Sequence, residues 1–504
     1  MLICAVDVGT TGTKTMIINE YGNKLAYAYE PYSLTTTADG KIEQNANDWW
    51  KATTSSIKAC IVQLSCQEQI SVISISAQGG SLVFTDKEGN PLDYSISWMD
   101  SSRGLPFIKP LLEWKSVDWF YKMSGWKLSP SMSAAKILWV KKNKPELLNP
   151  GNRIFSTIDF LNYKFTSQFV IDPSSASMTQ LFDFRNKAWN ISLLSYLGID
   201  QSMLPKIVPT GQIIGELTPA SLNECGLQDK VHLICGGHDQ YCAAIGSGSI
   251  HSGDVMLSTG TAWVSLGIDQ HISFDFNGYP GIGNHIVDQM MGRMSTVSTG
   301  GVSLEWARGK LFSSSLDNGD IHKISYENLE TELVKRIKNA SELIFYPHFQ
   351  GMGYPTWNHS AKASLMGLTL DHDKHDITLA IMEGVVFQVA YGLTYDQKLG
   401  FSPQNINLLG GASRSRLWKN IIVSVLDIPV TVFSEADLAC YGVAIIASYS
   451  LGLIQSYEHG VKTMVKSYSL SPPDTQWREH YLKKFDCFIK GYKSINDFYS
   501  DSGG

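Results

Sequence analysis

Turns rich in glycine and threonine recur from residue 7 to residue 415, and most of them directly follow a short apolar run. They occupy residues 7–14, 236–240, 257–261 and 410–415. A strand that ends in such a turn presents backbone N–H groups and hydroxyls without bulk, which suits a polyphosphate. Because acidic residues stand in two of the turns, at Asp7 and Asp239, the pattern predicts a nucleotide held between two related halves.

The length of the chain predicts two large domains. At 504 residues it is too long for one compact core, and 43% hydrophobic with 17% charged residues is ordinary for a soluble globular protein. Apolar strands that lead into glycine turns, together with helical segments such as 47–63 and 417–426, indicate α/β domains facing a central cleft. Glycine and serine concentrate near residue 248, so we expect domains at 1–247 and 248–504.

Charge and cysteine content argue against several classes of partner. A net charge of -6 gives no electrostatic case for a nucleic acid or an anionic membrane. The N-terminus enters a strand without a basic or apolar signal segment, and no eighteen apolar residues run together, so we expect no membrane span. The eight cysteines form no CxxC pair, which favours buried thiols, a reducing compartment and a cytoplasmic location.

Two longer segments resemble motifs of a known family. Residues 131–143 fit the first motif throughout, and the stretch from 363 to 383 fits the second. With further matches in the same order from Asp7 to Gly442, the chain resembles the FGGY carbohydrate kinases, within the wider actin-like ATPase group. The resemblance implies two actin-like (ribonuclease H-like) ATPase domains, ATP and Mg²⁺ as cofactors, and a small-molecule sugar as substrate. Relatives are commonly homodimers, although no residue here demonstrates one.

Asp239 is the candidate general base. It follows a buried strand at a glycine-flanked turn, where a carboxylate can approach a sugar hydroxyl, and by resemblance it takes the place of the family's catalytic aspartate. The alternative is an aspartate that only caps the helix after it. The neighbouring His238 suggests a His-Asp relay, but adjacent residues usually point apart and no serine nucleophile motif accompanies them. We therefore expect His238 to be a packing residue.

The first turn supplies the second acid. Asp7 ends a strand beside threonines, where it can hold Mg²⁺ through water, with Asp239 as the other metal-facing carboxylate. The turn is neither a Walker A loop, which needs four residues between its glycine and its GK pair, nor a GxGxxG fingerprint. The residues expected at the phosphates are Thr10, Thr11, Gly12 and Lys14.

The resemblance assigns small residues of the second half to the nucleotide. Such residues let the backbone approach the α-phosphate and ribose, and Ser415 falls where the family often has a polar adenine contact. Taken alone, each glycine pair would more often be an ordinary turn. The assigned residues are Gly260, Thr261, Gly300, Gly301, Gly410, Gly411, Ala412 and Ser415.

The sugar pocket is expected around two short segments of the first half. Paired donors and acceptors suit hydroxyl-rich ligands, and an acid between apolar neighbours needs a partner, for which Arg103 is the obvious residue. Xylulose kinases usually carry Met-His after the glutamine, where this chain has two glycines, and the usual W-x-D-x-R spacing is one residue longer here. The candidate residues are Gln78, Gly79, Gly80, Trp98, Asp100, Arg103 and Gln240.

These observations favour an ATP-dependent sugar kinase whose acceptor is a five-carbon ketose such as xylulose. Gluconate, a hexulose or an erythritol-type polyol is the alternative substrate. From other classes, an actin-like or chaperone-like ATPase would share the phosphate turns, and a silent sugar-binding regulator would have no need of both acids.

Overall fold

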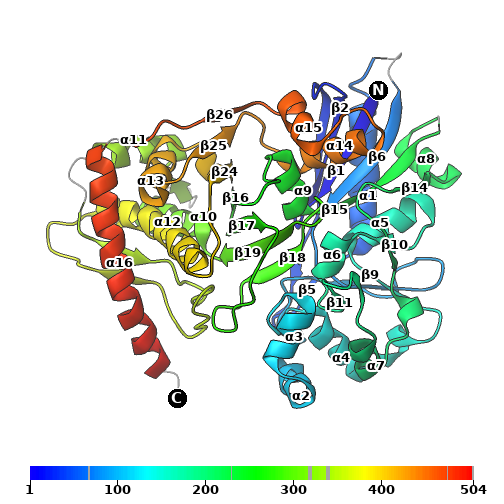
Figure 1. Cartoon of the computed structure of the whole chain (residues 1–504), viewed down its shortest axis with the longest axis horizontal. Coiled ribbons are helices and arrows are strands. Elements are labelled where there is room, and N and C mark those ends of the chain that lie inside the picture. Colours follow the sequence, from blue (N-terminus) through cyan, green and yellow to red (C-terminus); the bar gives the residue numbers. More distant parts are fainter. Residues whose placement is uncertain (66–68, 229, 316–320, 337–340, 474, 502–504) are drawn as a thin grey trace. The chain divides into compact units, whose positions relative to one another are not determined.

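The computed structural model describes residues 1–65, 69–228, 230–315, 321–336, 341–473 and 475–501. They divide into two compact units, each a mixture of helices and sheets, so the predicted α/β class is confirmed (Figure 1). Unit 1 contains 1–250, 281–292 and 437–466, and unit 2 contains 251–280, 293–436 and 467–504. Two segments from beyond the expected boundary near residue 248 therefore pack with unit 1.

The central sheet of unit 1 has the order β14-β15-β6-β1-β2-β3. The antiparallel meander β1–β3 occupies one side, and β6 and β15 continue the sheet parallel to β1. Nearly every residue of β1 and β6 is buried, as expected for central strands covered on both faces. The strands are β1 (Leu2–Val8), β2 (Gly12–Asn19), β3 (Lys24–Pro31), β6 (Ile70–Ala77), β14 (Ile213–Glu216) and β15 (His232–His238).

Helices α9 (Asp239–Gly246) and α14 (Leu438–Ser450) pack against each other and against this sheet, although almost two hundred positions of sequence separate them. Their backbones touch at glycines. A Cβ on Gly246 would lie 2.0 Å from the carbonyl oxygen of Leu438, and one on Gly442 would lie 1.8 Å from that of Cys242. Any side chain at either position would force the helices apart.

Smaller elements complete unit 1. The sheet β4-β5-β8 and helix α4 carry residues that matter below, and α1 and α5 pack on the central sheet. The helices are α1 (Ala46–Ile61), α2 (Ile108–Trp114), α3 (Val117–Ser124), α4 (Ser133–Asn143), α5 (Thr157–Thr166), α6 (Pro173–Ser177), α7 (Ile191–Leu197), α8 (Pro219–Cys225) and α15 (Tyr457–Met464). The short strands are β4 (Thr35–Thr36), β5 (Ile42–Gln44), β7 (Val83–Thr85), β8 (Ser95–Ile96), β9 (Arg153–Phe155), β10 (Val170–Ile171), β11 (Phe182–Asp183), β12 (Ala188–Trp189), β13 (Lys206–Ile207) and β18 (Gly281–Asn284).

Unit 2 repeats the plan of a sheet with parallel central strands. Its strands run in the order β19-β17-β16-β24-β25-β26, and β16 is parallel to β24 and antiparallel to β17. They are β16 (Asp254–Thr259), β17 (Trp263–Asp269), β19 (Met291–Val297), β24 (Asn405–Gly410), β25 (Val430–Phe433) and β26 (Ser467–Ser469). Two short pairs lie apart, β20 (Ser313–Ser315) with β21 (Ile321–Lys323) and β22 (Ile344–Tyr346) with β23 (Ser364–Met366).

The core of unit 2 forms around a long apolar helix. By length and composition α12 could cross a membrane, but 83% of its apolar window is buried inside the protein, as expected of a core helix. The C-terminal α16 places Tyr481, Phe485 and Phe488 in the same core. The helices of the unit are α10 (Gly300–Leu311), α11 (Tyr326–Arg336), α12 (Lys374–Lys398), α13 (Arg416–Leu426) and α16 (Thr475–Asp501).

Two of the expected turns are shorter than the sequence suggests. Gly12 to Lys14 belong to β2, so the first turn is only residues 9–11. Gly236 and Gly237 belong to β15, and a Cβ on Gly236 would lie 1.8 Å from the carbonyl oxygen of Ile75 in β6. Gly236 therefore allows close contact with β6, and neither glycine lies in a turn. Of the cysteines, six described ones are buried and Cys487 is exposed, while Cys66 lies outside the described residues.

Candidate active site

Three parallel strands of unit 1 end at the same edge of the sheet. Val8 of β1 pairs with Ala77 of β6, and Ala77 pairs with His238 of β15. The next residues along the chain are Gly9, Gln78 and Asp239. The carboxyl ends of parallel strands are a common place for ligand sites in α/β folds. The sheet register thus brings together the first turn, the glutamine segment and the candidate base.

Asp7 lies one position before this edge. Its Oδ1 accepts a hydrogen bond from the Ser76 hydroxyl at 2.9 Å. Burial raises the pKa of Asp7 to about 6; the charge of Lys14 opposes the rise and that of Asp239 adds to it. The two acids expected to face a metal are therefore close enough to sense each other's charge.

Lys14 lies opposite Asp7 in the β1–β2 ladder and is only partly exposed. Its Nζ forms an ion pair with Asp437, just before α14, at 2.8 Å. Although burial opposes ionisation of the ammonium, the charges of Asp7 and Asp437 raise the pKa of Lys14 above its usual range. The lysine expected at the phosphates is thus permanently charged and held between two carboxylates.

His238 and Asp239 do not point apart, contrary to expectation. The imidazole Nε2 lies 3.3 Å from Asp239 Oδ1, which also accepts the backbone N–H of Gln240 at 2.6 Å. His238 is the residue before α9, and Asp239 is the first residue of the helix. Asp239 Oδ1 therefore accepts the N–H of the second helical residue, which is one of the groups that a capping side chain can bind. This contact at the start of α9 engages one of the two carboxylate oxygens of Asp239.

Gln78 and Trp98 are linked to the first turn. Gln44 of β5 donates from Nε2 to the carbonyl oxygen of Thr10 at 2.7 Å and accepts from Gln78 Nε2 at 3.1 Å. The Trp98 indole donates to Thr10 Oγ1 at 3.3 Å. The side chains of Trp98 and Met99 are 43% exposed, so they offer an apolar surface next to these polar groups. Gln44 was not identified from the sequence.

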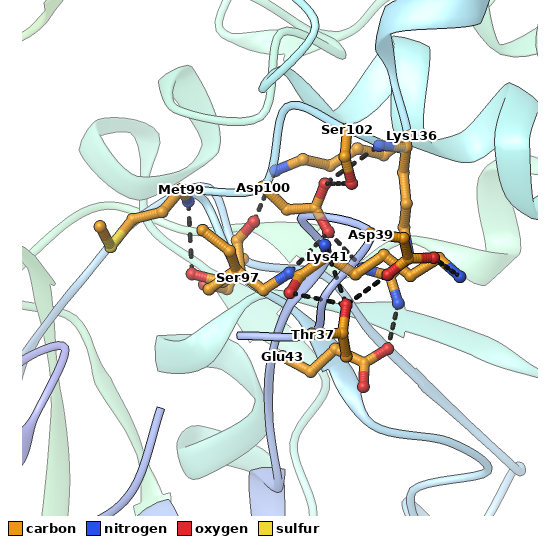
Figure 2. A network of polar contacts seen from close by, with 12 residues as sticks. Thr37, Asp39, Lys41, Glu43, Ser97, Met99, Asp100, Ser102 and Lys136 are labelled. Atoms are coloured by element: carbon orange, nitrogen blue, oxygen red, sulfur yellow. Dashed lines mark hydrogen bonds and ion pairs between the residues drawn. The ribbon is translucent and has the colours of Figure 1, made fainter. Parts of the chain in front are cut away.

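Asp100 and Arg103 form a buried network with β5, and Figure 2 labels Asp100 and Glu43 of this network. Arg103 forms ion pairs with Asp100 and with Glu43, and its guanidinium carbon lies 5.0 Å from the ring centre of Trp139. The carboxylate of Asp100 also accepts the backbone N–H groups of Ile42 at 3.0 Å and of Arg103 at 3.1 Å. Asp100 is fully buried, and both of its carboxylate oxygens accept hydrogen bonds. It therefore supports, from inside the protein, the loop that carries Trp98.

The motif at 131–143 supplies two residues of α4 to this network. Besides Trp139, it contributes Lys136, which is fully buried and donates to the carbonyl oxygen of Ser97 at 2.8 Å (Figure 2). Burial lowers the pKa of Lys136 to about 7, with the charge of Asp100 opposing the fall and that of Arg103 adding to it. Residues of the motif therefore hold the loop that carries Trp98 in place from within the protein.

Unit 2 contains a cavity of about 810 Å³ at the ends of β16 and α11. The cavity is lined by five of the residues expected at the nucleotide, namely Gly260, Thr261, Gly301, Gly411 and Ser415. The remaining three, Gly300, Gly410 and Ala412, are their chain neighbours and do not line it. The other lining residues are Thr259, Val302, Leu304, Glu305, Tyr326, Glu327, Leu329, Glu330, Leu333, Met382, Arg414 and Trp418. The mixture of small residues at one end and apolar side chains at the other suits a nucleotide.

Hydrogen bonds shape the small-residue end of this cavity. The N–H of Gly301, at the start of α10, donates to the carbonyl oxygen of Gly260 at 3.1 Å. The Thr259 hydroxyl donates to the carbonyl oxygen of Leu409 and accepts the N–H of Ala412 at 3.0 Å. The turns after β16 and β24 are thereby fixed side by side next to a helix N-terminus, where phosphate groups are favoured.

Ser415 is the residue just before α13, and its hydroxyl already forms two hydrogen bonds. It accepts the N–H of Trp418 at 3.1 Å as a helix cap and donates to Glu330 at 2.8 Å. Glu330, on α11, also accepts the N–H of Leu417 at 2.6 Å. Glu330 could not be identified from the sequence, because a glutamate on an amphipathic helix carries no recognisable signal.

Comparison with known proteins agrees with this arrangement. The model for the N-terminal domain of the FGGY family of carbohydrate kinases matches residues 2–246, and that for the C-terminal domain matches residues 258–451. The chain belongs to the FGGY family of carbohydrate kinases. It is an ATP-dependent carbohydrate kinase with the two-domain, actin-like ATPase fold that the sequence predicted.

The relatives of this FGGY kinase carry more than one name. A xylulose kinase from Staphylococcus epidermidis is 24% identical over 99% of this chain and 98% of its own length. A gluconokinase from Bacillus licheniformis is 26% identical over 98% of this chain and 96% of its own length. The crystal structure of xylulose kinase from Lactobacillus acidophilus has a TM-score of 0.90 and 22% identity, with both chains covered completely.

Proposed function

We propose that this FGGY kinase transfers the γ-phosphate of ATP to a hydroxyl of a five-carbon ketose such as xylulose, with Asp239 as the general base. The observation that carries the proposal is the position of Asp239 at the shared edge of β1, β6 and β15, beside Gln78 and the first turn. The xylulose kinases among its relatives support the pentulose. Gluconate is the alternative, because gluconokinases match equally well.

The reaction needs one proton removed and one phosphoryl group transferred. Asp239 accepts the proton of the sugar hydroxyl while that oxygen forms a bond to the γ-phosphorus and the bond to the β-phosphate oxygen breaks, giving the sugar phosphate and ADP. In unit 1, Lys14 and the backbone of the turn at 9–11 offer a positive charge and N–H groups to phosphate oxygens. In unit 2, the cavity offers Gly260, Thr261 and Gly411 to the phosphates of the nucleotide.

Mg²⁺ fits the pair of acids. Magnesium is commonly held by one or two carboxylates together with phosphate oxygens and water, and Asp7 and Asp239 are two carboxylates with coupled charges. Among the described residues no three His, Cys, Asp or Glu side chains form a cluster that could hold a metal ion by itself. When bound, it neutralises charge on the phosphate oxygens.

The sugar would lie on the apolar surface of Trp98 and Met99, within reach of Gln78 and Gln240. We infer that Asp100 and Arg103 position this loop from inside the protein, since both are buried and paired with each other. Gly79 and Gly80 add backbone N–H groups to the pocket and little bulk. A substrate contact from Asp100 itself would require its network to open.

A coupled ADP-release screen over pentuloses, hexuloses, pentitols, tetritols and gluconate tests the proposal. We expect the highest kcat/KM with a pentulose, and we expect Asp239→Asn to lower kcat by about 10²–10⁴-fold while ATP still binds. Asp288→Asn is the matched control, because Asp288 has an 82% exposed side chain and should leave kcat unchanged. If gluconate or a hexulose gave the highest kcat/KM, the pentulose proposal would fall; if Asp239→Asn kept its kcat, Asp239 would not be the base.

A further inference from the structure

The imidazole of His238 is held rigidly beside the candidate base. The residue is only 5% exposed, and its ring meets that of Tyr241 edge-on, with centres 5.9 Å apart. Its backbone N–H donates to the Ser174 hydroxyl at 3.0 Å, and that hydroxyl donates in turn to the buried Asp172. The backbone and the ring of His238 are therefore both fixed before any substrate binds.

The ring occupies space that the absence of a side chain at position 79 leaves open. A Cβ built on Gly79 would lie 2.6 Å from His238 Cδ2 and 2.7 Å from Met178 Cγ. Non-bonded carbon atoms do not lie that close together. Any other residue at position 79 would therefore displace both the imidazole and Met178. Gly79 is therefore a condition for the observed position of His238.

The polar contacts of Asp239 within the described residues involve one of its two oxygens. Oδ1 accepts a hydrogen bond from the N–H of Gln240 at 2.6 Å and lies 3.3 Å from His238 Nε2 as an ion-pair contact, whereas Oδ2 has no partner among the residues that the structure describes. The Nδ1 atom of His238 is buried and also lacks a partner within that part of the chain. With a proton on Nε2, the imidazole presents a donor 3.3 Å from Oδ1.

We propose that His238 is a positioning residue that anchors Oδ1 of Asp239, so that Oδ2 faces the sugar hydroxyl with its lone pair free. The inference rests on the proposed role of Asp239 as the base. The hydrogen bond from Gln240 and the contact with His238 together restrict rotation of the carboxylate, and the orientation of a reacting group can change the rate by orders of magnitude. His238 takes no proton from the substrate, and its effect is confined to how the base is held.

Steady-state kinetics of three single variants test the role of the Nε2–H. His238→Gln keeps a donor at a similar distance from the backbone, whereas His238→Leu keeps apolar volume and removes the donor. We expect His238→Leu to lower kcat about ten- to a hundredfold with KM changed by no more than about twofold, and His238→Gln to recover most of kcat. Gly79→Ala should lower kcat in a similar way, because its methyl group displaces the imidazole.

A double variant separates this role from simple packing. If Gly79→Ala acts by moving the imidazole, it should reduce kcat much less in the His238→Leu background than alone. Equal losses in both backgrounds, or a His238→Leu variant with unchanged kcat, would overturn the proposal for His238 even when Asp239→Asn is inactive. An active Asp239→Asn variant would instead overturn the role of the base. If His238→Leu fails to fold, Gly79→Ala decides alone. An unchanged kcat in Gly79→Ala overturns the proposal, and a kcat that stays reduced at saturating sugar supports it.

Discussion

Replacing Asp7 by asparagine should make the unliganded protein more stable and inactive at the same time. Asp7 is a partly buried acid whose charge, with no nucleotide bound, is opposed by burial and by the charge of Asp239 and only partly offset by Lys14. The amide oxygen of an asparagine can still accept the hydrogen bond from Ser76. The substitution therefore removes an unfavourable charge and keeps the local geometry.

The size of the expected gain in stability follows from the pKa of Asp7. Folding raises the pKa of Asp7 from 3.8 to about 6. Since one pKa unit corresponds to about 1.4 kcal/mol, the ionised carboxylate costs at most about 3 kcal/mol. Because Asp7 is only partly buried, water screens some of this cost, and we expect a gain of about 1–2 kcal/mol in the free energy of unfolding at pH 8.

The gain in the free energy of unfolding from Asp7→Asn must depend on pH. The folded state binds a proton at Asp7 below about pH 6, while the unfolded chain does so only near pH 3.8. The cost of the charge is thus fully present above about pH 7, falls through pH 6 and is gone below about pH 4. The difference between Asp7→Asn and the unsubstituted protein should shrink accordingly as the pH is lowered.

Urea unfolding followed by circular dichroism, without nucleotide, measures this difference from pH 8 to pH 4.5. Asp288→Asn serves as the control for removal of an exposed carboxylate and should show little change at any pH. The reasoning is refuted if Asp7→Asn is less stable than the unsubstituted protein at pH 8, or if its gain is the same at every pH. An ADP-release assay on the same samples should show that the stabilised variant has lost most of its kinase activity.

Two further variants address the loop support and the nucleotide cavity. Arg103→Met removes a cation that is paired with both Asp100 and Glu43, and because it leaves Asp100 buried without its counter-charge, we expect urea unfolding to show a loss of about 3–5 kcal/mol; a loss below about 1 kcal/mol would mean that the pairs contribute little. Glu330→Ala removes the acceptor for Ser415 and for the N–H of Leu417, so we expect KM for ATP to rise about tenfold with kcat for the sugar reaction nearly unchanged. A fall in kcat at saturating ATP would instead implicate Glu330 in the chemical step.

The sequence could predict strands that lead into glycine turns, because these follow from local patterns. The apolar runs before the turns at 7–14 and 257–261 belong to β1 and β16, and the turn after β16 lines the cavity of unit 2. Arg103 was also foreseen as the partner of Asp100, since a buried acid needs a nearby cation. These inferences depend on neighbours in the sequence or on one rule of burial.

Features that depend on contacts between distant segments could not be predicted. Whether Gly236 ends a strand or continues it depends on how closely β6 approaches, which a local pattern does not encode. The direction of the His238 ring depends on the absence of a side chain at position 79 in another strand's turn. Glu330 reaches Ser415 from a helix eighty-five residues earlier in the chain.

The close contact between α9 and α14 has a consequence for how the protein is made. Unit 1 is finished only by the segment 437–466, which leaves the ribosome after most of unit 2. Until then, the surfaces of α9, β1 and β6 that α14 covers remain bare on the nascent chain. Residues 1–250 therefore cannot complete the fold of unit 1 until residues 437–466 have been synthesised. A chaperone that shields these apolar surfaces during synthesis should increase the yield of native protein more than it would for a kinase with contiguous domains.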